Sequence, residues 1–120
     1  MPIVIKKPIQ IKAAGKKLKI IKEYVGRINT KTESISIAQM ISPLGWSEPF
    51  QTPEFDEYTL VLKGRLKVKT DKKVFIVKQG QAILVNKGER IQYSTPYAGG
   101  AQYVAICLPA FSPLTVHRDE

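Results

Sequence analysis

Short segments in which apolar and polar residues alternate fill residues 34–108, and they constrain the fold more than any other feature. The segment "SISIAQMIS" (34–42) alternates Ile35, Ile37 and Ile41 with small or polar residues. A period of two is typical of strands that bury one face. The segments repeat about every 8 to 12 residues, which predicts an all-β sandwich or barrel. Turn signals separate them at Lys63-Gly64, Thr70-Asp71-Lys72-Lys73, Gln79-Gly80 and Lys87-Gly88.

Residues 65–80 predict a β-hairpin. Leu66 and Val68 alternate with lysines before a polar turn, and three apolar residues, Val74, Phe75 and Ile76, follow the turn. The alternation predicts that Leu66, Val68, Val74 and Ile76 face the core, and we expect Phe75 to join them. The lysines then keep the other side of the hairpin soluble.

The composition is that of a single globular domain. A chain of 120 residues with 43% hydrophobic and 24% charged residues can bury one core without staples. The longest apolar run, "VAICLPAF", is eight residues, far below the roughly 20 of a membrane span. No secretory signal follows Lys6 and Lys7. We expect a cytoplasmic protein with no membrane partner, in which Cys107 is a small buried hydrophobe and not a nucleophile.

Basic residues concentrate in an N-terminal arm, residues 1–31. The arm holds nine lysines and arginines against one acid, Glu23, whereas residues 32–120 hold ten against nine. This distribution of the net charge of +9 fits a solvated lysine-rich face or a surface for an anionic partner. Nucleic acid is not the expected partner, because Tyr24 is the only aromatic residue of the arm. Residues 15–25 fit a helix or a strand, and their pattern does not decide between them.

Two glycines and a glutamate are spaced in residues 45–64 as in a known motif. Gly45 is followed after five residues by Gln51 and Pro53, then after three residues by Glu57, and after six by Gly64. This resembles G-x5-H-x-H-x3 or x4-E-x6-G, the first motif of the cupin superfamily of RmlC-like jelly-roll barrels. Gln51 and Pro53 stand where the family has histidines.

A second set of residues fits the second cupin motif, G-x5-P-x-G-x2-H-x3-N. Gly80 and Gly88 match, whereas Asn86, Ile91 and Thr95 replace the proline, the histidine and the asparagine. The resemblance implies a small all-β, single-domain cupin jelly-roll barrel with a basic N-terminal arm. It also implies that side chains of both motifs point to one place inside the barrel.

The metal ligands that the family uses are mostly missing. First-row metals prefer several imidazole and carboxylate donors, and only Glu57 and the weak amide donor Gln51 remain at the motif positions. The sole histidine, His117, lies in the C-terminal tail, where we expect an exposed bystander. We therefore expect no cofactor, although a divalent metal held by Glu57 and Gln51 is left open.

The stretch "VNKGERIQYSTPYAGGAQYVAICLPAF" (85–111) is similar to the ethanolamine-utilisation cupins of bacterial microcompartments. Those relatives also lack the usual histidines. An acetate kinase activity is attributed to them, but this chain has no G-x-x-x-x-G-K-[ST] loop and no acidic pair for magnesium. The resemblance therefore implies kinship, and the activity is not carried over.

Glu57 is the candidate functional residue, because a carboxyl group buried in a barrel without a metal gains a raised pKa and can serve as an acid or base. Tyr93 is its candidate catalytic partner. The other expected cavity residues, suited to a sugar or a small hydroxy-carboxylate, are Gln51, Thr59, Tyr58, Ile91, Tyr103 and Trp46. Lys63, Arg65 and Arg90 are expected on the exterior, with Arg90 near enough to the mouth to meet an anion.

Three hypotheses about function remain open. The first and preferred one is a metal-free or weakly metal-binding cupin that holds a small polar ligand. The second is a sugar-type isomerase, epimerase or lyase that uses Glu57 with Tyr93, or a metal held by Glu57 and Gln51. The third is a structural or interaction protein that binds an anionic partner through the arm and has a filled barrel with no ligand. Deletion of residues 1–17 is expected to abolish partner binding under the third hypothesis and to leave ligand binding intact under the first.

The chain is expected to form one domain, 1–120, and, on the family resemblance, a homodimer. Residues 1–31 are the arm or the first strands, residues 34–108 the barrel, and residues 109–120 a tail that begins where Pro109 ends the last strand. The arm or the tail is expected to cross to the other subunit.

Overall fold

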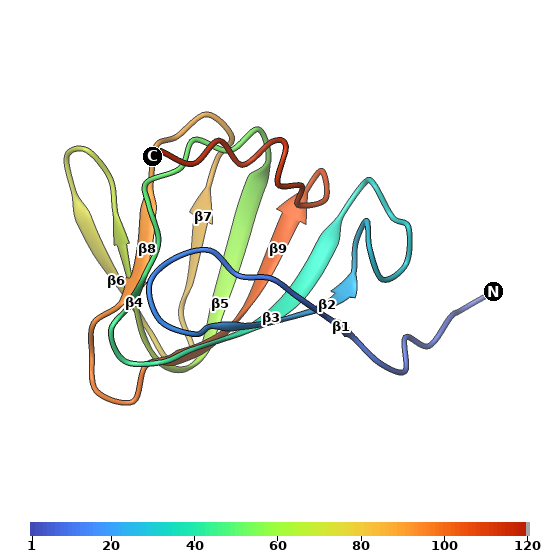
Figure 1. The fold of residues 1–120 in the computed structure, drawn as a ribbon, viewed down its shortest axis with the longest axis horizontal. Helices are drawn as coiled ribbons and strands as arrows, with labels where there is room; N and C mark the ends of the chain where they lie inside the picture. Colours follow the sequence, from blue (N-terminus) through green and yellow to red (C-terminus); the bar gives the residue numbers. More distant parts are fainter. Residues whose placement is uncertain (120) are drawn as a thin grey trace.

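The computed structural model describes residues 1–119, which fold into strands and loops without a helix (Figure 1). The all-β prediction is confirmed, while Glu120, the end of the expected tail, lies outside the described residues. No helix in residues 1–119 is long and apolar enough to span a membrane. The strands are β1 (Ile9–Ile11), β2 (Ile20–Val25), β3 (Ser36–Ser42), β4 (Trp46–Ser47), β5 (Asp56–Lys69), β6 (Val74–Lys78), β7 (Ala82–Val85), β8 (Gln92–Thr95) and β9 (Ala101–Leu108).

The strands form one curled antiparallel sheet. Its order is β1-β2-β3-β9-β5-β8-β4, and β6 and β7 also pair with β5. The first half of β5 pairs with β9 and β7, and its second half pairs with β6 and β8. The sheet therefore wraps into an open barrel, and an N-terminal segment crosses its concave side (Figure 1). This is the predicted small jelly-roll architecture.

Gly64 does not form the predicted turn. β5 runs through it without interruption from Asp56 to Lys69, with a register shift between Val61 and Lys63 where it pairs with β9. Gly64 has a φ of 76°, and a Cβ atom there would collide with the carbonyl oxygen of Gly100. The glycine thus serves a bulge and a close backbone approach, which bend one long strand across both halves of the barrel.

The predicted hairpin exists, but its second strand faces the core through a different residue. β5 and β6 pair from Arg65 with Lys78 to Lys69 with Val74. Val74, Phe75 and Ile76, expected in the core, are exposed, whereas Val77 opposite Leu66 is buried. The hairpin tip projects beyond the barrel (Figure 1), so alternation near the tip has no core to face.

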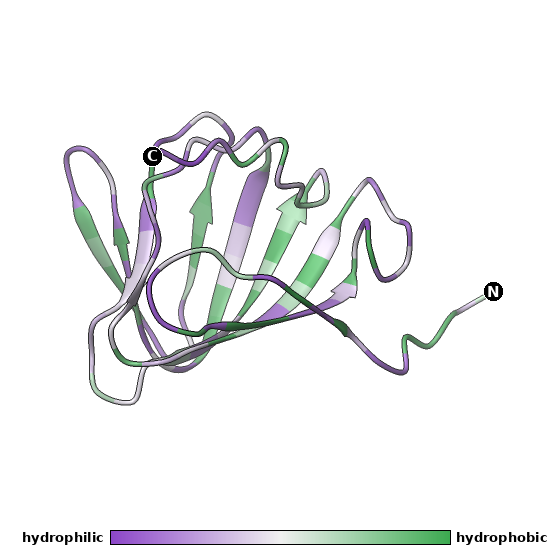
Figure 2. Cartoon of the chain, viewed as in Figure 1, coloured by the Kyte–Doolittle hydropathy of each residue, from purple (hydrophilic) through white to green (hydrophobic). Residues whose placement is uncertain are grey.

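The sheet presents its more apolar face to the outside. In β3 the small residues Ser36, Ala38 and Ser42 are buried, and the isoleucines of the alternating pattern face outward. Hydrophobic bands also mark β5, β7 and β9 (Figure 2). We call the following residues the outer face: Ile37 and Ile41 of β3, Tyr58, Leu60 and Leu62 of β5, Leu84 of β7, and Val104, Ile106 and Leu108 of β9.

Two clusters of buried side chains form the core. In the smaller one, Phe55, Cys107 and Val116 are buried and Phe111 packs edge-on against Phe55 with ring centroids 5.9 Å apart. The larger cluster comprises Trp46, Val61, Leu66, Val68, Val77, Val85, Ile91, Tyr93, Ala101 and Tyr103.

Both ends of the chain pack on their own barrel. Residues 20–25, which fitted a helix or a strand, form β2, and β1 pairs with it. The tail after β9 folds back along residues 50–54, where Thr52 N–H donates to the carbonyl of His117 and Glu54 N–H donates to the carbonyl of Thr115. His117 is exposed, as expected, and its ring contacts Glu54.

Candidate functional site

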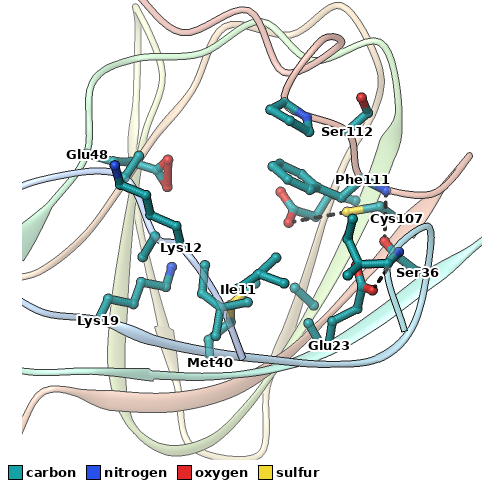
Figure 3. A pocket seen from close by; sticks show the side chains of 18 of the residues that line it. Ile11, Lys12, Lys19, Glu23, Ser36, Met40, Glu48, Cys107, Phe111 and Ser112 are labelled. Carbon is teal, nitrogen blue, oxygen red and sulfur yellow. Dashed lines mark hydrogen bonds between the residues drawn. The ribbon is translucent and has the colours of Figure 1, made fainter. Parts of the chain in front are cut away.

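The concave face of the sheet encloses a cavity of about 850 Å³. Inward side chains of β2, β3, β5, β8 and β9 line it together with the C-terminal tail, and residues 9–14 cross its mouth. Ile11 and Lys12 of this crossing segment are visible at the edge of the cavity in Figure 3. Polar and charged side chains lie among apolar ones in this lining, and because most of the lining surface is apolar, the polar groups interact more strongly than they would in open water.

Glu57 stands in the cavity wall between two other strands. Tyr93 of β8 donates a hydrogen bond from Oη to Glu57 Oε1 at 2.8 Å. Cys107, directly opposite Glu57 in the pairing of β5 with β9, places Sγ 3.7 Å from Glu57 Oε2 (Figure 3). The two residues that sequence analysis paired as candidate acid and base are therefore in contact.

The cavity alters the acidity of all three groups. Burial raises the pKa of Glu57 above its ordinary value, and the hydrogen bond from Tyr93 opposes part of this rise. Burial also raises the pKa of Tyr93 well above its usual range, and the Glu57 carboxylate adds to the effect. Burial, followed by Glu57, raises the pKa of the Cys107 thiol, so this residue stays protonated and is a poor nucleophile.

Glu48 is a second buried carboxyl group, which sequence analysis did not single out. Its Oε2 lies 3.7 Å from Arg118 Nε, and only 8% of Glu48 is exposed. Burial raises the pKa of Glu48 from 4.5 to about 7, against the opposing charges of Lys19 and Arg118. The sequence did contain one indication that Glu48 faces the cavity. Trp46 was expected to face inward, and Glu48, two residues later on an extended chain, faces the same way.

Lys19 brings a cation to the same side of the cavity. Its Nζ lies 3.8 Å from the centroid of the Trp46 ring and 5.1 Å from that of the Tyr103 ring. Such cation–π contacts hold an ammonium group in place without neutralising it. Lys19 comes from the arm, whose lysines looked in the sequence like a solvated face.

Gln51 is fixed by its backbone while its side chain lacks a partner. Its N–H donates to the carbonyl of Ile91 at 2.8 Å, and Ile91 N–H donates back at 2.9 Å. Gln51 also forms an isolated antiparallel bridge with Arg118. Its buried Oε1 accepts no hydrogen bond, although buried acceptors in folded proteins nearly always have a donor.

The model of one protein family matches residues 22–111, and its description is "Ethanolamine utilisation protein EutQ". The chain belongs to the EutQ family. The match spans the barrel and most of the cavity lining, so it confirms the cupin relationship that the spacing and the 85–111 stretch indicated.

Solved structures place this EutQ-family chain among cupin-like folds. It resembles the EutQ protein of Clostridium difficile with 21% identity and a TM-score of 0.65 over 79% of this chain and 65% of that one. A putative ethanolamine utilization protein Q from Salmonella typhimurium LT2 has 19% identity and a TM-score of 0.66, covering 88% and 98%. A predicted oxalate decarboxylase from Thermotoga maritima has 17% identity and a TM-score of 0.73, covering 89% and 99%.

One curated relative is a much longer protein, and only part of it matches this chain. The EutQ-family chain is 41% identical over 101 residues to a Myxococcus xanthus (strain DK1622) protein named endoribonuclease YbeY. The match covers 84% of this chain and 34% of that protein, so this chain spans about a third of that relative's length.

The side chains at the family's metal positions do not fit a metal in this EutQ-family chain. Pro53 offers only its carbonyl, which accepts the N–H of Gly88, and Ile91 offers no donor. Glu57 is engaged with Tyr93. Within residues 1–119 no three His, Cys, Asp or Glu side chains gather as potential metal ligands.

The remaining expected site residues separate into three groups. Thr59 and Tyr103 line the cavity, although Tyr103 Oη is hydrogen-bonded to Ser42 Oγ at 2.9 Å. Trp46 and Ile91 belong to the large core cluster and support the wall from behind. Tyr58 was wrongly expected in the cavity: it is 45% exposed on the outer face, because neighbours along a strand point to opposite sides.

Lys63, Arg65 and Arg90 are exposed, as expected. Arg90 forms ion pairs with Asp71 and Asp119 outside the barrel, and it does not line the cavity. The expectation that Arg90 could meet an anion at the barrel mouth is therefore not supported by its position.

The far end of the cavity contains a carboxylate with a structural role. Glu23 is buried on β2, and its Oε2 accepts hydrogen bonds from Ile28 N–H at 3.1 Å and Asn29 N–H at 2.8 Å. These bonds close the turn between β2 and β3. The two carboxyl groups without backbone donors, Glu48 and Glu57, are therefore the stronger functional candidates.

Proposed function

We propose that this EutQ-family chain binds a small polar ligand, of the size of a sugar or a small carboxylate, in its barrel. The observation that carries the proposal is the buried Gln51 Oε1, which has no hydrogen-bond partner at the wall of a cavity of about 850 Å³. Cavities of about 300–1,000 Å³ with a few converging polar groups are typical of small-molecule sites. A ligand hydroxyl or amine would restore the missing hydrogen bond of Gln51.

A binding screen with a cavity-filling variant tests this proposal. We expect ligand-observed NMR with a panel of sugars and small carboxylates to detect binding to the wild type and to lose it in Ala38→Phe, because Ala38 lines the cavity. Ala98→Phe, which adds the same side chain at an exposed loop position, should retain binding. Equal binding by all three proteins would place the ligand outside the barrel and contradict the proposal.

We propose further that the site works without a metal, because its donors are one amide and one carboxyl group engaged by a phenol. Elemental analysis of protein purified without chelator should then find no transition metal near one ion per chain. Stoichiometric metal that is lost in Glu57→Gln would contradict this part of the proposal.

A second candidate function is proton transfer by Glu57 and Tyr93. It is favoured by their 2.8 Å hydrogen bond and by burial, which raises the pKa of Glu57 and so makes its carboxyl group a stronger base than an exposed glutamate. Once the screen names a ligand, its isomerisation or epimerisation can be followed by NMR. An enzyme should lose turnover in Glu57→Gln while it still binds the ligand, whereas a pure binding protein shows no turnover in the wild type.

We also propose that the chain forms a homodimer through its outer face. Outward positions 37, 39, 41, 58, 60, 62, 82, 84, 102, 104, 106 and 108 carry no charged residue, although the chain has a net charge of +9. The charged outward residues beside them, Lys22, Asp56 and Lys63, pair with Gln39, Leu108 and Gln102 at the border of this patch. Apolar patches of this extent are usually covered. A second copy is the occupant that fits, because two copies repel each other over their basic surfaces and can meet without repulsion on the uncharged part of this face.

A further inference from the structure

One side of the cavity concentrates charge that the proposed binding function does not yet use. Glu48, Lys12 and Lys19 lie together there (Figure 3), and Arg118 approaches Glu48 from the C-terminal tail. The residues come from the crossing segment, the region before β2, the loop after β4 and the tail. Such convergence from three distant parts of the chain, the N-terminal region, the loop after β4 and the tail, indicates a built site and not a chance surface cluster.

The cations at this side outnumber the acids that could neutralise them. Lys19 Nζ rests on the rings of Trp46 and Tyr103. Arg118 Nε is buried and makes no hydrogen bond, since Glu48 at 3.7 Å is too distant for one. A guanidinium group with an unused buried N–H and a neighbouring ammonium group are suited to a carboxylate.

The side-chain oxygen of Gln51, a hydrogen-bond acceptor without a partner, lies next to Arg118. Gln51 and Arg118 are bridge partners on adjacent extended segments, so their side chains leave the backbone on the same side and about 5 Å apart. Gln51 Oε1 has no donor, and Arg118 Nε has no hydrogen-bond acceptor, although the Glu48 carboxylate lies 3.7 Å from it. A single small molecule satisfies both if its hydroxyl or amino group is close to its carboxylate.

We infer that the ligand, given the binding function proposed above, is a small 2-hydroxy or 2-amino acid whose carboxylate pairs with Arg118 and Lys19 and whose donor bonds to Gln51. Binding is accompanied by uptake of a proton at Glu48. The apolar remainder of the ligand extends toward the Phe55 and Phe111 side of the cavity.

The proton uptake follows from electrostatics. Glu48 has a pKa of about 7 in the free protein, so near neutral pH it is partly ionised and competes with the ligand for both cations. A carboxylate placed between Lys19 and Arg118 repels ionised Glu48 and raises its pKa further, so Glu48 gains a proton. Binding should therefore strengthen as the pH falls from about 8 to about 6. The titratable and charged groups that face Glu48 are Lys12, Lys19, Glu57, Tyr93 and Arg118.

Calorimetry with three matched probes tests the ligand class. Mandelate carries the carboxylate, the adjacent hydroxyl and an apolar ring, phenylacetate lacks the hydroxyl, and mandelamide lacks the charge. We expect mandelate to bind about tenfold more tightly than either of the others, because mandelamide lacks the charge-assisted bond to Arg118 and phenylacetate leaves the buried Gln51 Oε1 without a donor. Arg118→Gln should lose the preference for mandelate over mandelamide, while Arg90→Gln, which removes an exposed charge, should keep it.

The proton is measured from the heat of mandelate binding at pH 7 in phosphate and in Tris, buffers with different ionisation enthalpies. The wild type should take up a fraction of a proton per ligand, and Glu48→Gln should bind mandelate with no uptake. Absence of uptake in the wild type, or uptake that persists in Glu48→Gln, would overturn the role of Glu48.

The outcomes separate this inference from the function on which it rests. Equal affinity for mandelate and mandelamide, or for mandelate and phenylacetate, overturns the 2-substituted acid and leaves ligand binding standing. Failure of all three probes also overturns the 2-substituted acid if the panel compound that binds in the cavity is neither a 2-hydroxy nor a 2-amino acid. If the panel also yields nothing, the proposed function fails with it.

Discussion

Glu48 and Glu57 occupy a space that water reaches poorly, and burial makes both hold their protons to a higher pH than exposed carboxyl groups do. Of the two, Glu57 could be predicted from the sequence, because the motif spacing fixed its strand and its inward direction. Gln51 followed from the same spacing. The partners Glu48, Lys19 and Arg118 could not be predicted, since they meet only through the folding of segments about 30 to 100 residues apart.

Replacing Glu48 by glutamine should stabilise the protein at alkaline pH. A folded pKa of about 7 against 4.5 means that the folded protein binds more protons, so wild-type stability is full below about pH 4.5 and falls as the pH rises through about 7. At pH 8 this loss amounts to about 3 kcal/mol, and Glu48→Gln should avoid most of it.

Urea unfolding at pH 5 and pH 8 measures the effect. Glu33→Gln, at an exposed glutamate, serves as the control and should follow the wild type at both pH values. A variant whose stability falls between pH 5 and 8 as steeply as that of the wild type would show that Glu48 does not carry the pH dependence.

At the scale of elements, the period of two located β3, β5, β6, β7 and β9 well, but it could not tell which face of a strand is inside. In β3 and the first half of β5 the larger apolar residues lie outside, because the inner face must leave room for a cavity and present Glu57 and Thr59 to it. The assumption that the apolar face is the buried one fails wherever a barrel keeps a polar interior. Alternation therefore predicted the elements and misassigned some of their faces.

The bend in β5 depends on the glycine that the sequence suggested as a turn. Gly64→Ala should destabilise the protein by more than about 2 kcal/mol, because it adds a collision with the Gly100 carbonyl to the cost of a positive φ. Gly80→Ala, at a similar φ of 82° with open space around it, should cost only about 1–2 kcal/mol. Thermal and urea unfolding of both variants measure these costs. Equal losses of unfolding free energy in the two variants would show that the close approach of Gly64 to Gly100 is not important for stability.

A deletion that tests the role of the basic arm without disturbing the cavity must end before residue 9, and not at residue 17 as the charge distribution suggested. Residues 9–14 form part of the cavity wall, Trp46 Nε1 donates to the Ala14 carbonyl at 3.1 Å, and Lys16 N–H donates to the Ser47 carbonyl at 2.8 Å. We therefore expect deletion of residues 1–17 to weaken the proposed ligand binding, whereas the sequence alone suggested that binding would stay intact.

We expect removal of residues 1–8 to preserve the affinity for the ligand and removal of residues 1–17 to weaken it more than about tenfold, a difference that titration calorimetry can measure. Two truncations of equal affinity would mean that the crossing segment does not close the cavity.

At the scale of the whole molecule, the contrast between a basic surface and an uncharged outer face predicts how copies of the chain meet. Leu60 lies near the middle of this face, opposite Val104 of β9, and is 44% exposed. Leu60→Lys should shift the protein to a monomeric mass, because it sets a charge against its own copy across a two-fold axis.

Sedimentation velocity over a range of concentrations tests the dimer. Leu44→Lys makes the same change at a leucine that is 49% exposed in a loop outside the outer face, and this variant should sediment as the wild type does. A monomeric wild type would remove the proposed dimer altogether.

We expect the segment across the cavity mouth also to govern how long a ligand stays bound. β1 holds to β2 through just three residue pairs, Ile9 with Glu23, Gln10 with Lys22 and Ile11 with Ile21, so it can detach while the rest of the sheet stays folded. The dissociation rate would then follow the opening of β1 and not the strength of the contacts deeper inside. Ligands of quite different affinity should leave with similar half-lives, and substitutions in β1 should change residence time more than equilibrium binding.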